Sequence, residues 1–442
     1  MSISRRELLR SLLHTTGSLA VGGSVLGALP AGRAGARLLA QVPPPAPETL
    51  SIAGTREPSV PNVEMEPYRI DFPPAAIEDL HRRIDATRWP EMPFETGWES
   101  GTNDAVLREL VAYWRNDYDW FAVQERLNQR THLRGPIEGE QLHCVVYEGE
   151  GADAPGRFPL LLLHGWPGSF HEFDAAAPRL AAGQGGAPGF DLVVPSLPGF
   201  AFSEAPRERG MNPTRIAERL HLLMGELGFE RYGVQGGDWG SIIATQMARL
   251  HPEALVGLHL NFVASAPAPP DGVEPSAEEV AYRAARARFQ GAETGYSSIQ
   301  GTRPQSLAYA QNDSPVGLLA WILEKYWAWS DHGDDLWETF SRDDILTTVM
   351  LYWLPGRVLS SARIYYETSN PIPGTAIGGR VEVPTGYARF PAEPWGPPRE
   401  VVERTYNLVH YSEPERGGHF PALERTMAWA EDVARFFGGL RA

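Results

Sequence analysis

The sequence is poor in cysteine, has a deficit of basic residues and has no cluster of metal-ligating side chains, and each shortage excludes a class of protein. Its single cysteine, Cys144, cannot form an intramolecular disulfide, and its place in an alternating apolar run predicts a buried strand residue. The 39 lysines and arginines are outnumbered by 55 aspartates and glutamates, which gives a net charge of -16. Without a basic stripe to bind phosphates, a nucleic-acid partner is excluded. No cysteines or histidines stand at metal-site spacings, so we expect neither a metal nor another cofactor.

The first forty residues differ from the rest of the chain. Arg5 and Arg6 precede a weakly apolar stretch at residues 11–29, and small residues follow, so residues 1–40 have the pattern of a twin-arginine export signal. Serine, threonine and glycine interrupt the apolar stretch, which disfavours a stable membrane helix in the mature chain. Residues 41–63 form a proline-rich linker. We therefore expect an exported protein, periplasmic or extracellular, whose mature chain begins at about residue 35 to 41. The alternative is a disordered basic start of a cytoplasmic protein.

Periodic apolar residues after this linker predict a large α/β enzyme. The 442 residues include 43% hydrophobic and 21% charged residues, as in soluble globular proteins. Residues 64–130 are expected to form a helical N-terminal extension, with helices at 73–88, 103–115 and 120–130. In residues 131–265 strand-like runs alternate with helical segments, which predicts the first part of a doubly wound, mostly parallel sheet. The expected strands are 140–148, 159–163, 190–194, 232–235 and 255–262, and the expected helices are 170–182, 212–227 and 241–251.

The alternation stops after residue 265. Residues 266–374 begin with a proline-rich segment and are then mainly helical, with helices expected at 278–289, 316–329, 334–340 and 342–354. Strand patterns return in residues 375–442, near Val381 and at 406–411, before a closing helix at 423–437. A helical insert before the last strands of such a sheet has the position of a cap over an active site.

An aspartate occupies the centre of a glycine-rich turn between an expected strand and an expected helix. The turn is Gly236-Gly237-Asp238-Trp239-Gly240. This is the pattern of the nucleophile elbow of α/β-hydrolases, in which the central residue is usually serine and the glycines relieve crowding. A carboxylate is already ionised at neutral pH and attacks without a base. Because it displaces a leaving group at saturated carbon and forms a hydrolysable ester, Asp238 indicates strained ethers or alkyl halides as substrates.

Two tryptophans are expected to stabilise an oxyanion through their backbone N–H groups. Trp166 lies in the loop after the 159–163 strand, and Trp239 directly follows the nucleophile; both positions supply oxyanion-hole donors in this fold. His164 begins the same loop and is expected to be structural, with hydrogen bonds inside the loop.

An acid and a base follow the last two strands. Glu393, after the strand near Val381, is the candidate that orients a base, and His419, on a glycine turn before the closing helix, is the candidate base. The order of nucleophile, acid and histidine along the chain is the order typical of this fold. His410 is a rival base, but it lies inside an apolar strand and is expected to pack there.

Taken together, these motifs resemble the microsomal-type epoxide hydrolases over nearly the whole chain from about residue 64. The motifs are Tyr113-Trp114-Arg115-Asn116-Asp117-Tyr118-Asp119-Trp120, His164-Gly165-Trp166-Pro167-Gly168-Ser169, Gly236-Gly237-Asp238-Trp239-Gly240-Ser241, Asn312-Asp313-Ser314-Pro315-Val316-Gly317-Leu318 and Arg416-Gly417-Gly418-His419-Phe420. The mammalian relatives keep a membrane anchor, whereas this chain has the pattern of an exported protein.

The resemblance implies a hydrolase that converts epoxides to vicinal diols through an alkyl-enzyme ester on Asp238. It also implies two cap tyrosines that hydrogen-bond the epoxide oxygen. Matching flanks give Tyr296 and Tyr365, with Tyr309 and Tyr366 as weaker competitors. The partners implied are a small apolar epoxide and water; the oligomeric state stays open. Such an activity would serve detoxification or the catabolism of aromatic hydrocarbons.

Two other functions use the same features. A haloalkane dehalogenase has the same Asp and His pair, and Trp239 would then bind halide; the tyrosine pair disfavours this alternative because a halide needs no proton. A catalytically inactive binding protein with this fold is the second alternative. It is disfavoured because a residue is present for every catalytic role.

Overall fold

The computed structural model describes residues 65–92, 94–95, 97–150, 158–183, 189–265, 267–372 and 377–441. The expected export signal at residues 1–40 and the linker at residues 41–63 lie outside these ranges. Within the described ranges, no helix combines the length and the apolar character needed to cross a membrane.

Nine strands of the described chain form one sheet in the order β1-β2-β3-β5-β4-β6-β7-β8-β9. Neighbours from β1 to β5 pair antiparallel, and those from β5 to β9 pair parallel. The expected doubly wound, mostly parallel sheet is therefore confirmed, and the antiparallel strands β1 and β2 at one end of it are additional. The strands are β1 (Glu66–Pro67), β2 (Thr131–Ile137), β3 (Glu140–Tyr147), β4 (Leu160–Leu163), β5 (Leu192–Pro195), β6 (Tyr232–Gly236), β7 (Leu255–Leu260), β8 (Val381–Ala388) and β9 (Tyr406–Ser412).

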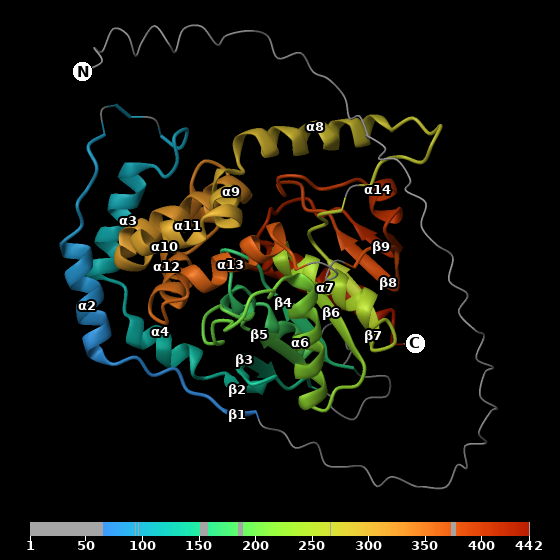
Figure 1. Cartoon of the computed structure of the whole chain (residues 1–442), viewed down its shortest axis with the longest axis horizontal. Coiled ribbons are helices and arrows are strands. Elements are labelled where there is room, and N and C mark those ends of the chain that lie inside the picture. Colours follow the sequence, from blue (N-terminus) through green and yellow to red (C-terminus); the bar gives the residue numbers. More distant parts are fainter. Residues whose placement is uncertain are drawn as a thin grey trace, which may run out of the picture. The chain divides into compact units, whose positions relative to one another are not determined.

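Helices cover both faces of this sheet. A Cβ on Gly233 of β6 would meet Phe437 of α16, whereas one on Gly236 would meet Gly240 of α7. Because side chains alternate along a strand, residues three apart point to opposite faces, so α7 and α16 cover opposite faces. Figure 1 shows α6 beside α7 over the parallel strands. The helices of these two layers are α5 (Ala177–Ala182), α6 (Pro213–Glu226), α7 (Asp238–Leu250), α14 (Arg399–Glu403), α15 (Pro421–Glu424) and α16 (Thr426–Gly438).

The N-terminal extension contains three helices at the expected places. Asn103 and Asp119 cap the second and third by accepting hydrogen bonds from the first backbone N–H groups of each helix. Trp114 and Trp120 are buried and anchor these helices in the core. The helices are α2 (Pro74–Asp85), α3 (Asp104–Asn116) and α4 (Trp120–Leu127).

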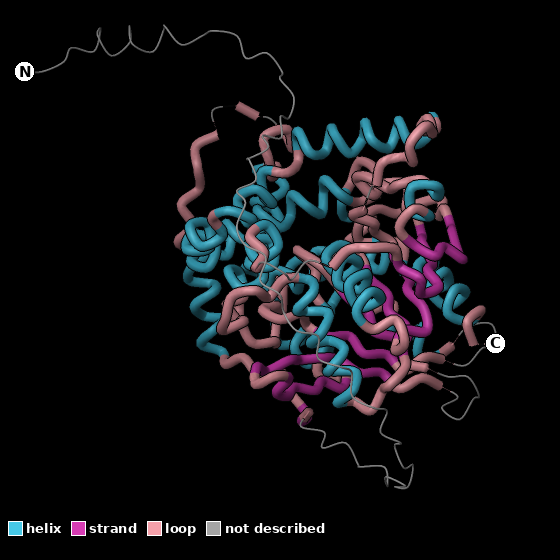
Figure 2. The backbone as a smooth tube through the Cα atoms, turned by 45° about the vertical axis from the view of Figure 1, so that its right-hand side comes forward, coloured by secondary structure: helices cyan, strands magenta, loops and turns pink. Residues whose placement is uncertain are grey.

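The helices between β7 and β8 form the cap, and the N-terminal extension contacts them. Arg83 of α2 forms an ion pair with Asp313 of the cap, and the Trp98 and Trp327 rings stack with their centroids 4.5 Å apart. In Figure 2 the strands form one group at the lower right, and most helices lie above and to the left. The cap elements are α8 (Ala277–Ala292), α9 (Gly295–Thr302), α10 (Pro304–Asp313), α11 (Pro315–Trp329), η2 (Leu336–Glu338), α12 (Arg342–Trp353) and α13 (Val358–Ser369).

Several expected elements differ in the structure. The single helix expected at 170–182 is a 3₁₀ turn, η1 (Phe170–Phe173), followed by α5, because Ser169 caps the turn and a proline stands at the start of α5. The helix expected at 334–340 is only the short turn η2. The cap helices α9, α10 and α13 were not predicted. The first of these is only eight residues long and contains two glycines, so its periodic signal is weak.

Candidate active site

Asp238 lies at the sharp turn where β6 ends and α7 begins. Its φ of 47° falls in the left-handed region, which costs a residue other than glycine about 1–3 kcal/mol. The flanking glycines are required by space: a Cβ on Gly240 would stand 2.1 Å from the Leu163 carbonyl oxygen, and one on Gly236 would stand 2.5 Å from Gly240. The helix begins at the aspartate itself, three residues before the expected start. The strained turn fixes the direction of the Asp238 side chain.

One backbone amide holds the Asp238 carboxylate. The Trp166 N–H donates to Asp238 Oδ1 over 2.8 Å. A Cβ on Gly165 would stand 2.1 Å from the same oxygen, so only glycine leaves space for the carboxylate there. Trp239, the second expected oxyanion donor, is the next residue of α7 and its side chain is buried. The Trp166 amide therefore contacts the carboxylate directly, and Trp239 follows Asp238 in the chain.

His419 connects Asp238 with Glu393. Its Nδ1 donates to Glu393 Oε2 over 2.9 Å, and its Nε2 stands 3.3 Å from Asp238 Oδ2. The side chains of His419 and Glu393 are buried, and that of Asp238 is 18% exposed. The His419 N–H also donates to the carbonyl of Trp329 in α11, so the cap fixes the loop that carries the histidine. The nucleophile, base and acid expected from the sequence are thus brought together.

The two carboxylates determine the charge of the histidine. Burial alone lowers the pKa of His419, but Glu393 and Asp238 outweigh burial and hold its pKa well above the usual value. Burial raises the pKa of Glu393, and the adjacent His419 opposes that rise. The bond from Nδ1 to Glu393 directs Nε2 toward Asp238, where a base is needed to activate water.

His410 and His164 have structural contacts away from the Asp238 carboxylate. His410 Nε2 contacts Asp432 Oδ1 at 3.1 Å, and His259 contacts the other oxygen of the same carboxylate at 3.0 Å. His164 Nδ1 bonds to the Gly165 carbonyl. Burial lowers the pKa of His164 to about 4, so it is neutral. His410 therefore lies in a separate buried cluster, and His164 stabilises its own loop.

Two cap tyrosines lie next to the tryptophans that flank Asp238. The Tyr296 ring of α9 stacks on Trp166 at 5.3 Å, and the Tyr365 ring of α13 meets Trp239 edge to face at 4.7 Å. The two tyrosine rings are 5.8 Å apart. Burial raises the pKa of both tyrosines, so both hydroxyl groups keep their protons. The Tyr365 hydroxyl has no hydrogen-bond partner among the described residues.

The competing tyrosines have different surroundings. Tyr309 is 73% exposed on α10. Tyr366 lies beneath the guanidinium groups of Arg209 and Arg363, at 5.4 and 5.5 Å from its ring centre. Neither ring contacts the tryptophans beside Asp238 in the described structure, so the geometry favours Tyr296 and Tyr365.

Sequence reasoning missed two charged residues near this site. Lys325 of α11 is buried with its ammonium 4.6 Å from the centre of the Tyr296 ring, and it forms an ion pair with Glu324. Glu172 lies in η1, and its carboxyl group interacts electrostatically with Asp238 and His419. A lysine inside the apolar run of α11 was a readable signal in the sequence. Glu172 gave no such signal, because nothing in the residues around it distinguishes it from a glutamate on the protein surface.

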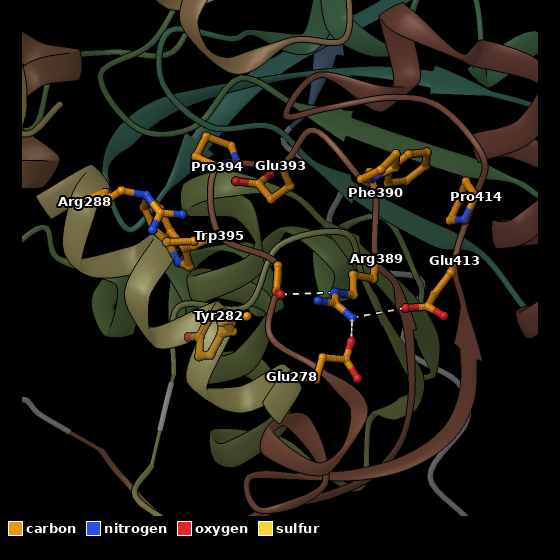
Figure 3. A pocket seen from close by; sticks show the side chains of 14 residues that line it. Glu278, Tyr282, Arg288, Arg389, Phe390, Glu393, Pro394, Trp395, Glu413 and Pro414 are labelled. Carbon is orange, nitrogen blue, oxygen red and sulfur yellow. Dashed lines mark hydrogen bonds and ion pairs between the residues drawn. The ribbon is translucent and has the colours of Figure 1, made fainter. Parts of the chain in front are cut away.

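A surface pocket of about 520 Å³ lies beside the loop that carries Glu393. Figure 3 shows Glu393 and Pro394 together at the top of the view, Trp395 beside Arg288 of α8, and Tyr282 of the same helix below them. Arg389 also lines the pocket. It forms ion pairs with Glu278 and Glu413 and donates a hydrogen bond to the Gly396 carbonyl. Glu393 lines this pocket and Asp238 does not, so the pocket does not contain the nucleophile.

The arrangement is suited to nucleophilic attack followed by hydrolysis. It combines a carboxylate held by an amide, a histidine oriented by a second carboxylate, and two neutral phenols on the cap side. Within the part of the chain that the structure describes, no three His, Cys, Asp or Glu side chains are grouped so that they could bind a metal ion.

Comparisons with known proteins agree with this arrangement. Residues 65–173 match the family described as epoxide hydrolase N terminus, and residues 159–295 match the alpha/beta hydrolase fold. The chain is 35% identical to epoxide hydrolase 1 of Sus scrofa over 87% of its own length and 91% of the relative. It is similar to the crystal structure of juvenile hormone epoxide hydrolase from Bombyx mori, with a TM-score of 0.76 and 31% identity over 86% of this chain and 95% of the other. Epoxide hydrolase of Aspergillus niger gives a TM-score of 0.74 and 30% identity over 85% and 96% of the two chains.

Proposed function

Because this chain belongs to the microsomal-type epoxide hydrolase family and converts epoxides to diols, we propose that Asp238, His419 and Glu393 perform the conversion. In this proposal Asp238 is the nucleophile, His419 is the general base and Glu393 orients the base. The observation that carries it is the chain of contacts from Glu393 through His419 to a carboxylate on a strained elbow. The dehalogenase alternative is not favoured, because the named relatives are epoxide hydrolases and two phenols stand on the cap side.

In the first step, Asp238 Oδ2 attacks one carbon of the epoxide ring. A C–O ester bond forms as the ring C–O bond breaks, and the negative charge moves to the former epoxide oxygen. An alkoxide is a poor leaving group, so a proton must be donated as the bond breaks. Tyr296 and Tyr365 supply hydrogen bonds and that proton, and their raised pKa keeps them protonated until the oxygen gains charge.

In the second step, water hydrolyses the ester. His419 Nε2 takes a proton from water, and the water oxygen bonds to Cγ of Asp238. The Trp166 and Trp239 amides stabilise the oxyanion, for which one donor contributes about 10²–10³-fold in rate. The C–O bond to the substrate then breaks, and the leaving diol oxygen takes the proton from His419. Asp238 is regenerated with one oxygen atom from water, and the second water proton, left on its carboxyl group, restores the tyrosine that gave a proton in the first step.

Removing a tyrosine hydroxyl should slow ester formation. We expect Tyr296→Phe and Tyr365→Phe each to lower the alkylation rate about 10-fold, and the double variant to lose about 10²–10⁴-fold, the range of general acid catalysis. The hydrolysis rate of ester that has already formed should stay close to wild type. The measurement is stopped-flow or quenched-flow ester formation with styrene oxide in excess enzyme.

Tyr366→Phe is the matched control for these variants, because the neighbouring ring lies beneath two arginines. It should form the ester at the wild-type rate. Equal losses in Tyr366→Phe and Tyr365→Phe would contradict the assignment of the second proton donor.

The pH dependence of ester hydrolysis should report the protonation of His419. Hydrolysis needs the neutral imidazole, so its rate should fall as the pH drops below the pKa of His419 in the ester. Glu393 raises that pKa. Glu393→Gln should therefore shift the acid limb to lower pH, and it should also lower the plateau because the ring loses its orientation. Single-turnover ester hydrolysis measured from about pH 5 to about pH 9, a range that brackets the usual pKa of histidine, tests this. An acid limb that Glu393→Gln leaves at the wild-type pH would refute the role of Glu393.

We also propose that the chain is exported by the twin-arginine route. We further propose that it acts on small apolar epoxides, and that this activity serves detoxification or the catabolism of aromatic hydrocarbons. Arg5 and Arg6 before a modest apolar stretch support the export. Aromatic rings around Asp238 support the substrate class. Fractionation of cells that carry Arg5→Lys/Arg6→Lys should find the protein retained inside, and export equal to that of the wild type would contradict the proposal.

A further inference from the structure

Glu172 lies on the segment that supplies the amide for Asp238. This segment runs from β4 through Trp166 and Gly168 into the turn η1. A Cβ on Gly168 would stand 2.7 Å from Glu172 Oε2, so the absent side chain at Gly168 leaves the space in which the carboxyl group lies. The Tyr352 hydroxyl donates to the Gly168 carbonyl over 2.6 Å and fixes the loop from the cap side. Glu172 therefore has a defined place beside the oxyanion loop.

The Glu172 carboxyl group has polar neighbours but no hydrogen-bond partner. Its backbone N–H bonds to the Ser169 carbonyl, whereas no hydrogen bond from a described residue reaches its side-chain oxygens. The ionisable groups that act on it are His419, Asp238 and Glu424. His419 Nε2 is likewise buried without a well-aligned hydrogen bond, although Asp238 Oδ2 lies 3.3 Å away.

A purely structural role does not explain this arrangement. Removing a carboxyl group from bulk water, even in part, without giving it a hydrogen-bond partner costs free energy, and a glutamate with a purely structural role would accept a hydrogen bond from a donor. Glu424 provides the contrast: its oxygens accept from the backbone N–H groups of Asp331, Gly418 and Phe420. Glu172 has no such bonds and stays half-buried, so its polar group is available to a small molecule in the site.

We propose that the carboxyl group of Glu172 binds the water molecule that hydrolyses the ester on Asp238. This inference rests on the proposed function, because it assigns a partner to the water in the second step. The water would be held between Glu172 and His419 Nε2, which keeps its oxygen directed at Cγ of Asp238. When Nε2 takes one proton, the other remains hydrogen-bonded to Glu172 while the oxygen bonds to the ester carbon. The diol oxygen then leaves with the proton held by His419, and the second water proton, left on the regenerated Asp238 carboxyl group, replaces the proton that a cap tyrosine gave in the first step.

The protonation state of Glu172 determines which other side chains could bind the water in its place. Burial raises its pKa to about 8; Asp238 and Glu424 add to that rise and His419 opposes it. The carboxyl group is therefore mainly neutral at pH 7, and a neutral carboxyl group both accepts and donates hydrogen bonds. A glutamine offers the same two functions in a similar shape. We therefore expect glutamine to replace Glu172 in the hydrolytic step, whereas an apolar side chain of similar size should not.

The test measures the two half-reactions separately in Glu172→Leu, Glu172→Gln and a matched control, Asp174→Asn. Asp174 lies two residues further in the same segment, but its carboxylate pairs with Arg130 at 3.0 Å. Rapid quenching with styrene oxide and mass spectrometry of the protein give the rates of ester formation and ester loss. We expect Glu172→Leu to form ester at the wild-type rate and to hydrolyse it about 10-fold or more slowly, the effect of losing a hydrogen bond to a group that gains charge. Glu172→Gln should stay within about 3-fold of wild type in both steps, and Asp174→Asn should match wild type.

The outcomes distinguish a water-binding role of Glu172 from a structural one. Slowed hydrolysis in Glu172→Leu with rescue by Glu172→Gln supports the water site. Wild-type hydrolysis in Glu172→Leu would overturn it, as would an equal loss of both half-reactions, which would indicate a structural role. If the wild-type protein formed no ester at all, the proposed function itself would fail, and that result is distinct from any change in the ester's lifetime.

Discussion

Asp238→Ala should reduce turnover of an epoxide by about 10⁴-fold or more, the scale of effect seen when an enzyme loses its nucleophile. The residue supplies the atom that bonds to substrate, so neither the histidine nor the tyrosines can compensate. Folding should be preserved, because the alanine removes a carboxylate that accepts one backbone hydrogen bond, from Trp166, and contacts His419, and the substitution changes no residue of the hydrophobic core. Diol formation from styrene oxide at saturating enzyme, together with a thermal unfolding curve, measures both properties.

Asp174→Ala is the control for this variant, since it removes a carboxylate of the same size outside the site. It should keep the wild-type rate of diol formation. An Asp238→Ala protein that turns over at a rate near wild type would contradict the assignment of the nucleophile.

His419→Gln should stop the reaction after its first step. Asp238 would still attack the epoxide, because an ionised carboxylate needs no base. Water would lack its base, and hydrolysis should slow by about 10²–10⁴-fold. The ester should accumulate and appear as an increase in protein mass equal to the mass of the substrate. Steady-state turnover should fall by the same factor as hydrolysis.

His410→Gln tests the rival histidine. His410 pairs with Asp432 in a cluster apart from Asp238, so the variant should lose some stability but hydrolyse the ester at the wild-type rate. If ester accumulated in His410→Gln and not in His419→Gln, the two roles would have to be exchanged.

The parallel part of the fold was readable from the sequence because its strands are continuous apolar runs. The run Leu160–Leu163 is fully buried in β4, and alternating residues marked β3. The strand β2 was missed because a proline and an arginine interrupt its apolar pattern. The cap helix α13 was missed for a related reason: polar residues, Ser361 and Glu367, occupy two of its buried positions and interrupt the apolar stripe.

The site was readable where residues follow the ends of strands. Asp238, Glu393 and His419 each follow a strand of the parallel sheet, and that sheet brings its carboxyl ends together. The tyrosines could not be located in this way, because Tyr296 and Tyr365 come from cap helices, and only the family resemblance indicated them. Lys325 and Glu172 became visible only through tertiary contacts, namely a ring beneath an ammonium group and a glycine that leaves space for a carboxyl group.

The covalent ester on Asp238 is the central claim, and a single turnover in ¹⁸O-labelled water tests it most directly. With enzyme in excess over styrene oxide, the label should enter the carboxylate at position 238, and the diol released in that first turnover should carry none. Peptide mass spectrometry locates the label. A first-turnover diol that contains the heavy atom, with an unlabelled Asp238, would mean that water opens the ring directly and would contradict this account.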